Sequence, residues 1–249
     1  MKRCTARELL ALCLLLIGSQ PALSADPATD MNIVTGLDIS NSISPDDVRR
    51  ALVDLAQAIR DPRVMTAIKA GRHGRIGFAV FAWHHGQFPP VVPWMTIASP
   101  QDAEIAARAI EARQSIDVEL EARQTEWYIG RLTDISQAIE HADAMLLEAP
   151  YRSAHPVVNI VGNGEDNVGE DPAVARDRFV ARGGTINGVV LGVDAAMVDY
   201  YRNRVIGGPA AFVMSIDRTA TMSDAFVRKF IGDIVAIRQA HGAAIPGGW

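Results

Sequence analysis

Cysteine is scarce in this sequence, and its scarcity excludes several kinds of chemistry. The 249 residues include only two cysteines, Cys4 and Cys13, both close to the N-terminus. If that stretch is removed on export, the remaining chain has no thiol. We therefore expect neither a disulfide framework nor a cysteine nucleophile. About 220 residues can form an ordinary hydrophobic core, so one domain is the expected count.

Long hydrophobic runs are also missing. The apolar stretch at residues 9–18 is shorter than the roughly 20 residues that a transmembrane helix needs. A basic start at residues 1–3 precedes it, and a small-residue segment at 21–25 follows it. This order is typical of a secretory signal peptide. We therefore expect residues 1–25 to be a signal peptide.

Cleavage is expected near Ser24 or Ala25, which leaves residues 26–249 as a single domain with its core at about 31–241. We expect this mature chain to be periplasmic or secreted, with no transmembrane segment. Removing residues 1–25 changes the formal net charge from −5 to −7, because three basic residues and one acidic residue are lost. An acidic chain makes a nucleic-acid partner improbable.

Catalytic motifs are absent as well. The sequence has no Gly-x-Ser-x-Gly elbow, no His-Glu-x-x-His and no P-loop lysine motif. The candidate histidines His84, His85, His141 and His155 are not placed by any motif, and His84-His85 is most simply a solvated hairpin turn. We therefore expect no catalytic residues and no enzymatic activity.

The most informative stretch is residues 31–47. Residues 31–37 are mostly apolar, as in a central parallel strand. Asp38, Ser40 and Ser42 then follow at every second position. Ser44 and the proline after it indicate the start of a helix. This order predicts a loop of oxygen-bearing side chains at a strand tip, where ligand sites form in open α/β sheets.

Strands and helices alternate through the rest of the chain. Further strands are predicted at 75–83, 91–97, 157–161, 185–191 and 211–216. Helices are predicted at 45–60, 99–113, 133–149, 171–183, 194–202 and from 223 onward, where Phe226, Phe230 and Ile234 form an apolar stripe. Prolines place 91–97 at a sheet edge, whereas 114–132 give no clear pattern. The alternation predicts an α/β, doubly wound sheet of mostly parallel strands.

Two more loops end at the same edge of the predicted sheet. One carries Thr133 at the start of a helix, where threonine is also a favoured N-cap. The other carries Asn163, two residues beyond Val161. Magnesium prefers oxygen ligands in near-octahedral geometry. The three loops therefore predict a divalent-cation site.

These motifs resemble those of a von Willebrand factor A domain with a metal-ion-dependent adhesion site (MIDAS). The matching segments are 38–42, 130–133 with 138–139 after it, and 161–165. Their spacing and order match the family from residue 31 to about 240, which is nearly the whole mature chain. More narrowly, the chain resembles a short exported bacterial branch of unknown function. The resemblance implies a six-stranded sheet with helices on both faces and one antiparallel edge strand.

The resemblance also implies the ligands and the partner. Ser40, Ser42 and Thr133 would hold Mg²⁺ or Mn²⁺, with Asp38 acting directly or through water. The vacant metal position would receive a Glu or Asp carboxylate of a protein partner. The implied function is therefore an exported binding module that engages a protein through a divalent cation.

The chain departs from the family at Asn163, where an aspartate is common. The amide oxygen can still accept a hydrogen bond from water or bind the metal. One negative charge is lost, however, so the affinity for the cation should fall. Asp134, Glu165 and Asp166 are auxiliary acidic residues that lie nearby in sequence. Two other readings stay open, which are a scaffold protein with a degenerate metal site and an uncharacterised hydrolase.

Overall fold

The fold is described from a computed structural model. Its described residues are 27–40, 42–84, 86–113, 132–216 and 222–242. The predicted signal peptide, its cleavage point, His85 and residues 114–131 lie outside this part of the chain. None of the described helices is both long enough and apolar enough to cross a membrane.

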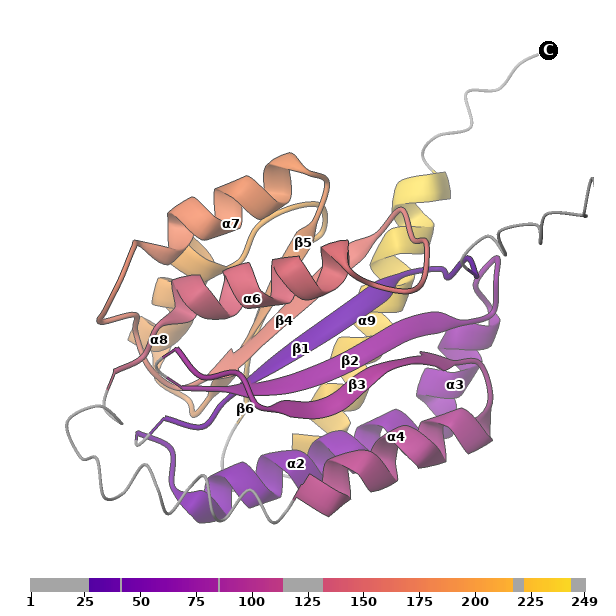
Figure 1. The fold of residues 1–249 in the computed structure, drawn as a ribbon, viewed down its shortest axis with the longest axis horizontal. Helices are drawn as coiled ribbons and strands as arrows, with labels where there is room; N and C mark the ends of the chain where they lie inside the picture. Colours follow the sequence, from indigo (N-terminus) through magenta and orange to yellow (C-terminus); the bar gives the residue numbers. More distant parts are fainter. Residues whose placement is uncertain (1–26, 41, 85, 114–131, 217–221, 243–249) are drawn as a thin grey trace, which may run out of the picture.

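A six-stranded sheet runs through the centre of the molecule (Figure 1). Its strand order is β3-β2-β1-β4-β5-β6, and all neighbouring strands are parallel except β2 and β3. The strands are β1 (Asn32–Asp38), β2 (Ile76–Trp83), β3 (Pro90–Ile97), β4 (Pro156–Gly162), β5 (Thr185–Leu191) and β6 (Val213–Ile216). The predicted fold class is confirmed, including the antiparallel strand at one edge.

Helices cover both faces of this sheet. One face carries α2 (Pro45–Arg60), α3 (Pro62–Lys69), α4 (Pro100–Ala112) and α9 (Met222–Gly242). The other carries α6 (Ile135–Leu147), α7 (Pro172–Ala181), α8 (Ala195–Tyr200) and the π-helical turn η4 (Tyr201–Val205). Each layer has its own buried cluster, because alternate side chains of the central strands point to opposite faces.

Polar residues followed by proline explain where several helices begin. The side chains of Ser44, Ser99 and Asp171 each accept a hydrogen bond from a backbone N–H of the first turn. Helix α3 is missing from the sequence-based prediction. Asp61 caps it and Pro62 is its first residue, so the pair that ends α2 also starts the next helix.

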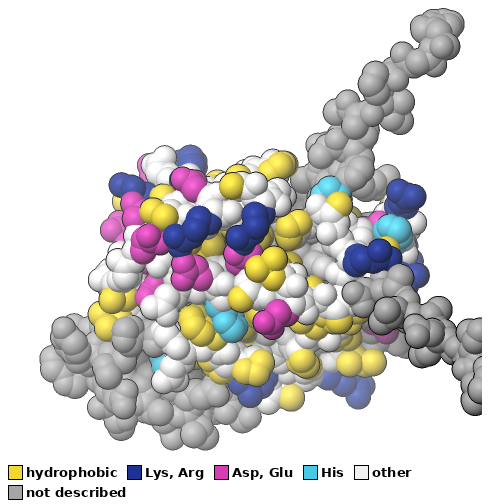
Figure 2. Space-filling model, turned by 45° about the horizontal axis from the view of Figure 1, so that its top comes forward, with side chains coloured by type: hydrophobic (Ala, Val, Ile, Leu, Met, Phe, Trp, Pro, Cys, Tyr) yellow, Lys and Arg dark blue, Asp and Glu magenta, His cyan; other side chains and the backbone are white. Residues whose placement is uncertain are grey.

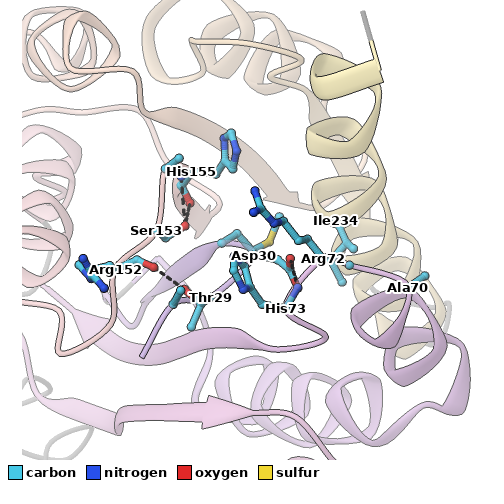
Figure 3. Close-up of a pocket in the computed structure, with 13 residues that line it drawn as sticks. Thr29, Asp30, Ala70, Arg72, His73, Arg152, Ser153, His155 and Ile234 are labelled. Atoms are coloured by element: carbon cyan, nitrogen blue, oxygen red, sulfur yellow. Dashed lines mark hydrogen bonds between the residues drawn. The ribbon is translucent and has the colours of Figure 1, made fainter. Parts of the chain in front are cut away.

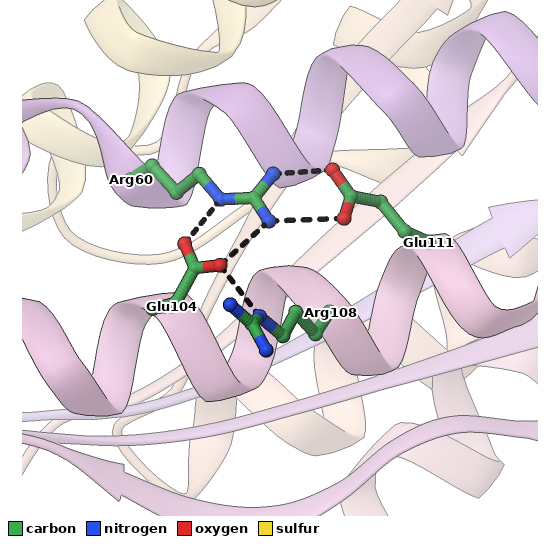
Figure 4. Close-up of polar contacts among 4 residues, drawn as sticks. All are labelled: Arg60, Glu104, Arg108 and Glu111. Atoms are coloured by element: carbon green, nitrogen blue, oxygen red, sulfur yellow. Dashed lines mark hydrogen bonds and ion pairs between the residues drawn. The ribbon is translucent and has the colours of Figure 1, made fainter.

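An arginine joins α2 to α4 on one face (Figure 4). The Arg60 guanidinium donates to Glu104 through Nε at 2.7 Å and to Glu111 through Nη2 at 2.9 Å. Both glutamates hold the pKa of Arg60 above its usual value, and Arg60 lowers the pKa of Glu104 to about 2. Arg60 thus bridges the end of α2 to two turns of α4, while buried apolar side chains of both helices pack together beneath it.

A buried ion pair ties α9 to the sheet. Lys229 and Asp233 are 1% and 3% exposed, and Lys229 Nζ donates to Asp233 Oδ2 at 2.7 Å. Asn187 of β5 donates to Asp233 Oδ1 at 2.9 Å, and Asn159 of β4 accepts from Lys229. Burial lowers the pKa of Lys229 and raises the pKa of Asp233. The predicted apolar stripe of this helix is buried beside them.

The helices α6 and α7 carry charges of both signs. Arg178 of α7 pairs with Glu140 of α6 and with Glu170, and Arg182 pairs with Asp143. Figure 2 shows basic and acidic side chains interspersed on this face. Such mixing leaves no broad basic surface there for a polyanion.

The predicted histidine turn is correct in shape, and its solvation is wrong for His84 alone among the described residues. His84 and Gln87 exchange backbone hydrogen bonds of 3.2 and 2.8 Å, as a tight turn requires. His84, however, is only 8% exposed. Gly86 and Gln87 are exposed, so the described part of the turn is solvated and only its first residue, His84, is buried.

Candidate metal centre

The three predicted loops lie at the carboxyl ends of the parallel strands. β1 ends at Asp38 and β4 ends at Gly162 in the neighbouring strand, so their loops emerge side by side. Thr133 lies just before α6, which packs against both β1 and β4. The order of strands β1 and β4 in the sheet is therefore what brings the three loops together.

The first loop is organised around its aspartate. Asp38 and Ser40 are both fully buried, and Asp38 Oδ1 accepts a 2.7 Å hydrogen bond from the Ser40 backbone N–H. The Ile43 backbone N–H then donates to the Ser40 carbonyl at 3.0 Å. An aspartate that binds the backbone two residues on favours a tight turn. This turn brings both serine hydroxyls to the same side.

Four oxygen-bearing residues connect the first loop to the third. Ser40 Oγ and Ser42 Oγ are 2.9 Å apart, and Ser42 Oγ donates to Asn163 Oδ1 at 2.7 Å. Asn163 Nδ2 returns a 3.0 Å hydrogen bond to the Ser42 carbonyl. Asp38, Ser40, Ser42 and Asn163 thus form one continuous chain of contacts.

The third loop also holds the second. The Thr133 backbone N–H donates to Asn167 Oδ1 at 2.9 Å, and the Asn167 N–H donates to the Thr133 carbonyl at 3.0 Å. Thr133 is 3% exposed, and its hydroxyl would lie 3.3 Å from a Cβ placed on Gly164. Thr133 therefore faces the third loop. It is not the N-cap that its position suggested, because Asp134 takes that role.

Two of the three auxiliary acidic residues are committed to α6. Asp134 Oδ1 accepts from the Gln137 N–H and the Ser136 hydroxyl, both at 2.9 Å. Asp166 Oδ2 accepts from the Ile135 N–H at 2.7 Å and from the Ser136 N–H. Both satisfy the otherwise unpaired N–H groups of a helix N-terminus. Burial, with a smaller contribution from Asp134, raises the pKa of Asp166 to about 6.

The third auxiliary residue, Glu165, is exposed. Asp38 is therefore the one acidic side chain in the chain of contacts that runs through Ser40, Ser42 and Asn163. Within the described residues, no group of three or more His, Cys, Asp or Glu side chains is arranged to hold a metal. A cation here would rely on hydroxyl and amide oxygens, which are neutral ligands.

The oxygen spacing fits a small hard cation. Neighbouring ligands of octahedral Mg²⁺ lie about 2.9 Å apart, since each Mg–O distance is about 2.0–2.1 Å. The Ser40–Ser42 and Ser42–Asn163 oxygen pairs, at 2.9 and 2.7 Å, already have this separation. These separations are also those of the hydrogen bonds that the groups make, so the donor set is compatible with a small divalent cation in spacing and chemistry, and its charge is low.

A buried tyrosine next to this site had no signal in the sequence. Tyr201 is fully buried, and its hydroxyl has no hydrogen-bond partner among the described residues. A Cβ on Gly162 would lie 2.6 Å from this hydroxyl and 3.1 Å from Asp38 Oδ2. Burial, with a smaller contribution from Asp38, raises the pKa of Tyr201. Only glycine fits at the end of β4 between these two groups.

His141 and His155, two further candidate histidines, make their described contacts outside the hydroxyl chain. The ring of His141 stacks on Phe88 with ring centroids 4.3 Å apart and meets Phe81 edge-on. Burial lowers the pKa of His141. His155 lies just before β4, at the opposite edge of the sheet. The described geometry therefore pairs neither residue with Ser40 or Ser42 as a general base.

Comparisons with solved structures agree with the fold. Two structures of proximal thread matrix protein 1 from the mussel byssus match with TM-scores of 0.55 and 0.50, at 14% and 15% identity. They cover 85% and 84% of this chain but 49% and 47% of the mussel chain, so this chain spans about half the length of that protein. A third structure of the mussel protein, with a zinc-occupied MIDAS motif, matches at 0.48, with 13% identity over 83% and 47% of the chains.

No curated protein matches the chain. The structural likeness shows that the fold is von Willebrand factor A-like. One family model matches residues 28–238, which is most of the chain. The chain belongs to the family described as protein of unknown function DUF1194.

Proposed function

We propose that this protein is an exported binding module that engages a protein partner through a divalent cation at the strand tips. The observation that carries the proposal is the chain of contacts from Asp38 through Ser40 and Ser42 to Asn163. Ser40, Ser42 and Thr133 would hold Mg²⁺ or Mn²⁺. Asp38 and Asn163 would bind directly or orient the other ligands.

The low charge of the donor set points to an anionic partner group. A bound Mg²⁺ keeps open positions that water or a ligand can fill. With Asp38 as the single acidic side chain among the proposed ligands, the cation would keep most of its positive charge. A Glu or Asp carboxylate of a partner protein would then bind it strongly, because less of that charge is already neutralised.

Export and the absence of catalysis belong to the same proposal. The basic start, short apolar run and small residues of positions 1–25 support a signal peptide. Export of this kind agrees with the resemblance to a short exported bacterial branch. The Ser42 hydroxyl donates its hydrogen bond to Asn163 rather than to a general base. Activation of a serine nucleophile needs such a base, so we propose a binding role and not an enzymatic one.

Calorimetric titration of the protein with Mg²⁺ and with Mn²⁺ tests the metal site. We expect binding by wild type and at least a tenfold loss of affinity in Asp38→Ala. The matched control is Glu165→Gln, which removes an exposed carboxylate from the same loop cluster and should bind like wild type. Equal affinities in wild type and Asp38→Ala would refute the site.

A metal-independent scaffold is the second candidate, and one observation favours it. Ser42 and Asn163 exchange two hydrogen bonds, so the first and third loops are closed by protein groups alone. In that case partner capture would be unaffected by a chelator. Metal-dependent capture would favour the first candidate.

A further inference from the structure

A cavity lies at the edge of the sheet opposite the candidate metal centre, where β1 and β4 begin (Figure 3). Its volume is about 580 Å³, within the roughly 300–1,000 Å³ typical of small-molecule pockets. Residues 28–31, 70–73 and 152–155 line it together with Ile234 of α9. The seven residues of β1, about 20 Å of extended strand, separate it from the candidate metal centre.

Hydrogen bonds hold the walls of this cavity in place. Asp30 Oδ1 accepts from the His73 N–H at 2.8 Å, and Oδ2 accepts from the Arg75 N–H at 3.2 Å. On the other side, the Thr29 N–H donates to the Arg152 carbonyl at 3.0 Å. Segments from distant parts of the chain therefore form the cavity, and hydrogen bonds between them hold it open as a preformed pocket.

The charge around the cavity is the reverse of the charge of the whole protein. The chain has a formal net charge of −5, yet the cavity is lined by Arg72, Arg152, His73 and His155. The one acidic lining residue, Asp30, already accepts backbone hydrogen bonds at both oxygens. Figure 2 shows basic and histidine side chains close together at the end of the molecule where β1 begins.

One arginine is placed to meet a ligand. Figure 3 shows the Arg72 side chain extending across the cavity toward His155, whereas Arg152 points away. Within the described part of the chain, Arg72 has no ion-pair partner. Part of the lining is apolar, because Ala28, Ala70 and Ala154 line the cavity and are at least partly exposed, with Met31 and Ile234 nearly buried behind them.

We propose that this cavity binds a small organic acid that carries an apolar body. Its carboxylate would accept hydrogen bonds from the Arg72 guanidinium, whose fork matches a carboxylate in two parallel hydrogen bonds. Its hydrocarbon part would lie against Ala28, Ala70 and Ala154 and leave water. One inward arginine beside an apolar lining suits a monoanion with a hydrocarbon chain better than a compact phosphate dianion.

NMR titration of the protein with octanoate, with EDTA present, tests this proposal independently of any metal. Backbone amide signals of Thr29, Gly71 and Ser153 should shift in a saturable manner, while those of Ser40 and Asn163 should not. Octan-1-ol has the same chain without the charge, and acetate has the charge without the chain. Both should bind at least about tenfold more weakly.

Arg72→Gln and Arg152→Gln are the matched variants, because both remove a positive charge from the same cavity lining. Arg72→Gln should weaken octanoate binding at least tenfold, and Arg152→Gln should leave it within about twofold. The proposal is overturned by the absence of saturable shifts, by octanol binding as tightly as octanoate, or by equal losses in the two variants.

Discussion

The Ser42 hydroxyl donates a 2.7 Å hydrogen bond to Asn163 Oδ1, although the two residues are 121 positions apart in the chain. The Asn163 amide group returns a hydrogen bond to the Ser42 carbonyl. An aspartate at position 163 could accept from Ser42 but could not donate in return. Asn163 therefore stabilises the metal-free loops at the expense of charge for a cation.

Replacing Asn163 with aspartate should weaken the contact between the metal-free loops and strengthen cation binding. We expect Asn163→Asp to tighten Mg²⁺ binding at least about tenfold at pH 7, because one added charge a few ångströms from the ion is worth more than about 1.4 kcal/mol. Calorimetry in 0.15 M salt measures this. Gln101→Glu adds the same charge at an exposed position in the first turn of α4 and should leave the affinity unchanged. This turn follows Ile97, which pairs with Ile76 at the edge of the sheet opposite the metal centre. Weaker binding by Asn163→Asp would contradict the proposed ligand set.

Gly162→Ala should destabilise the protein through Tyr201. The new methyl group would lie 2.6 Å from the Tyr201 hydroxyl, and overpacking of this kind costs about 1–3 kcal/mol. Urea denaturation measures the free energy of unfolding. Tyr201→Phe removes a hydroxyl that has no partner among the described residues, so it should be close to neutral alone. In the double variant, Tyr201→Phe should recover part of the stability that Gly162→Ala loses. Purely additive effects of the two substitutions would argue against this contact.

The buried pair on α9 predicts a large asymmetry between single and double replacements. Lys229→Met should cost about 3–5 kcal/mol, because it leaves Asp233 buried without its cation. Adding Asp233→Leu should restore much of that stability, since it removes the unpaired buried carboxylate and leaves two apolar side chains of similar volume. Denaturant midpoints of the wild type and the two variants decide this. A double variant that is less stable than the single one would show that the network with Asn159 and Asn187 dominates.

Asp166 predicts a pH dependence of stability between about pH 4 and pH 6. Its pKa in the folded protein is about 6, above the ordinary value of about 3.9 in an unfolded chain. The folded state therefore binds more protons in this window, and the contribution of Asp166 to stability is lost as the pH rises through it. Asp166→Asn keeps an oxygen acceptor for α6 but does not titrate. The free energy of unfolding of wild type minus that of this variant should fall from pH 4 to pH 6. A difference that does not change with pH would contradict the raised pKa of Asp166.

The sequence was sufficient to predict which loops meet, because the rule behind that prediction is simple. Parallel strands present their carboxyl ends at one edge, so a polar loop after Asp38 and another after Gly162 had to emerge together once β1 and β4 were neighbours. The strand and helix pattern was readable for the same reason. Apolar periodicity and proline-marked helix starts are local signals.

What could not be predicted depends on where side chains point after folding. Asp134 and Asp166 lie close to the metal centre in sequence, but the unpaired N–H groups of α6 attract both carboxylates. The position of Thr133 favours an N-cap, but Asp134 takes that role. Tyr201 approaches Asp38 and Gly162 only through the packing of η4 on the sheet, which has no local sequence signature.

The most direct test of the account is capture of a partner from the native cell envelope on immobilised protein, with Mg²⁺ and with EDTA. Wild type and Glu165→Gln should retain the same partner in Mg²⁺ and lose it in EDTA, while Asp38→Ala should not retain it in either condition. Retention of that partner by wild type in EDTA, or by Asp38→Ala in Mg²⁺, would contradict binding through a cation at the strand tips.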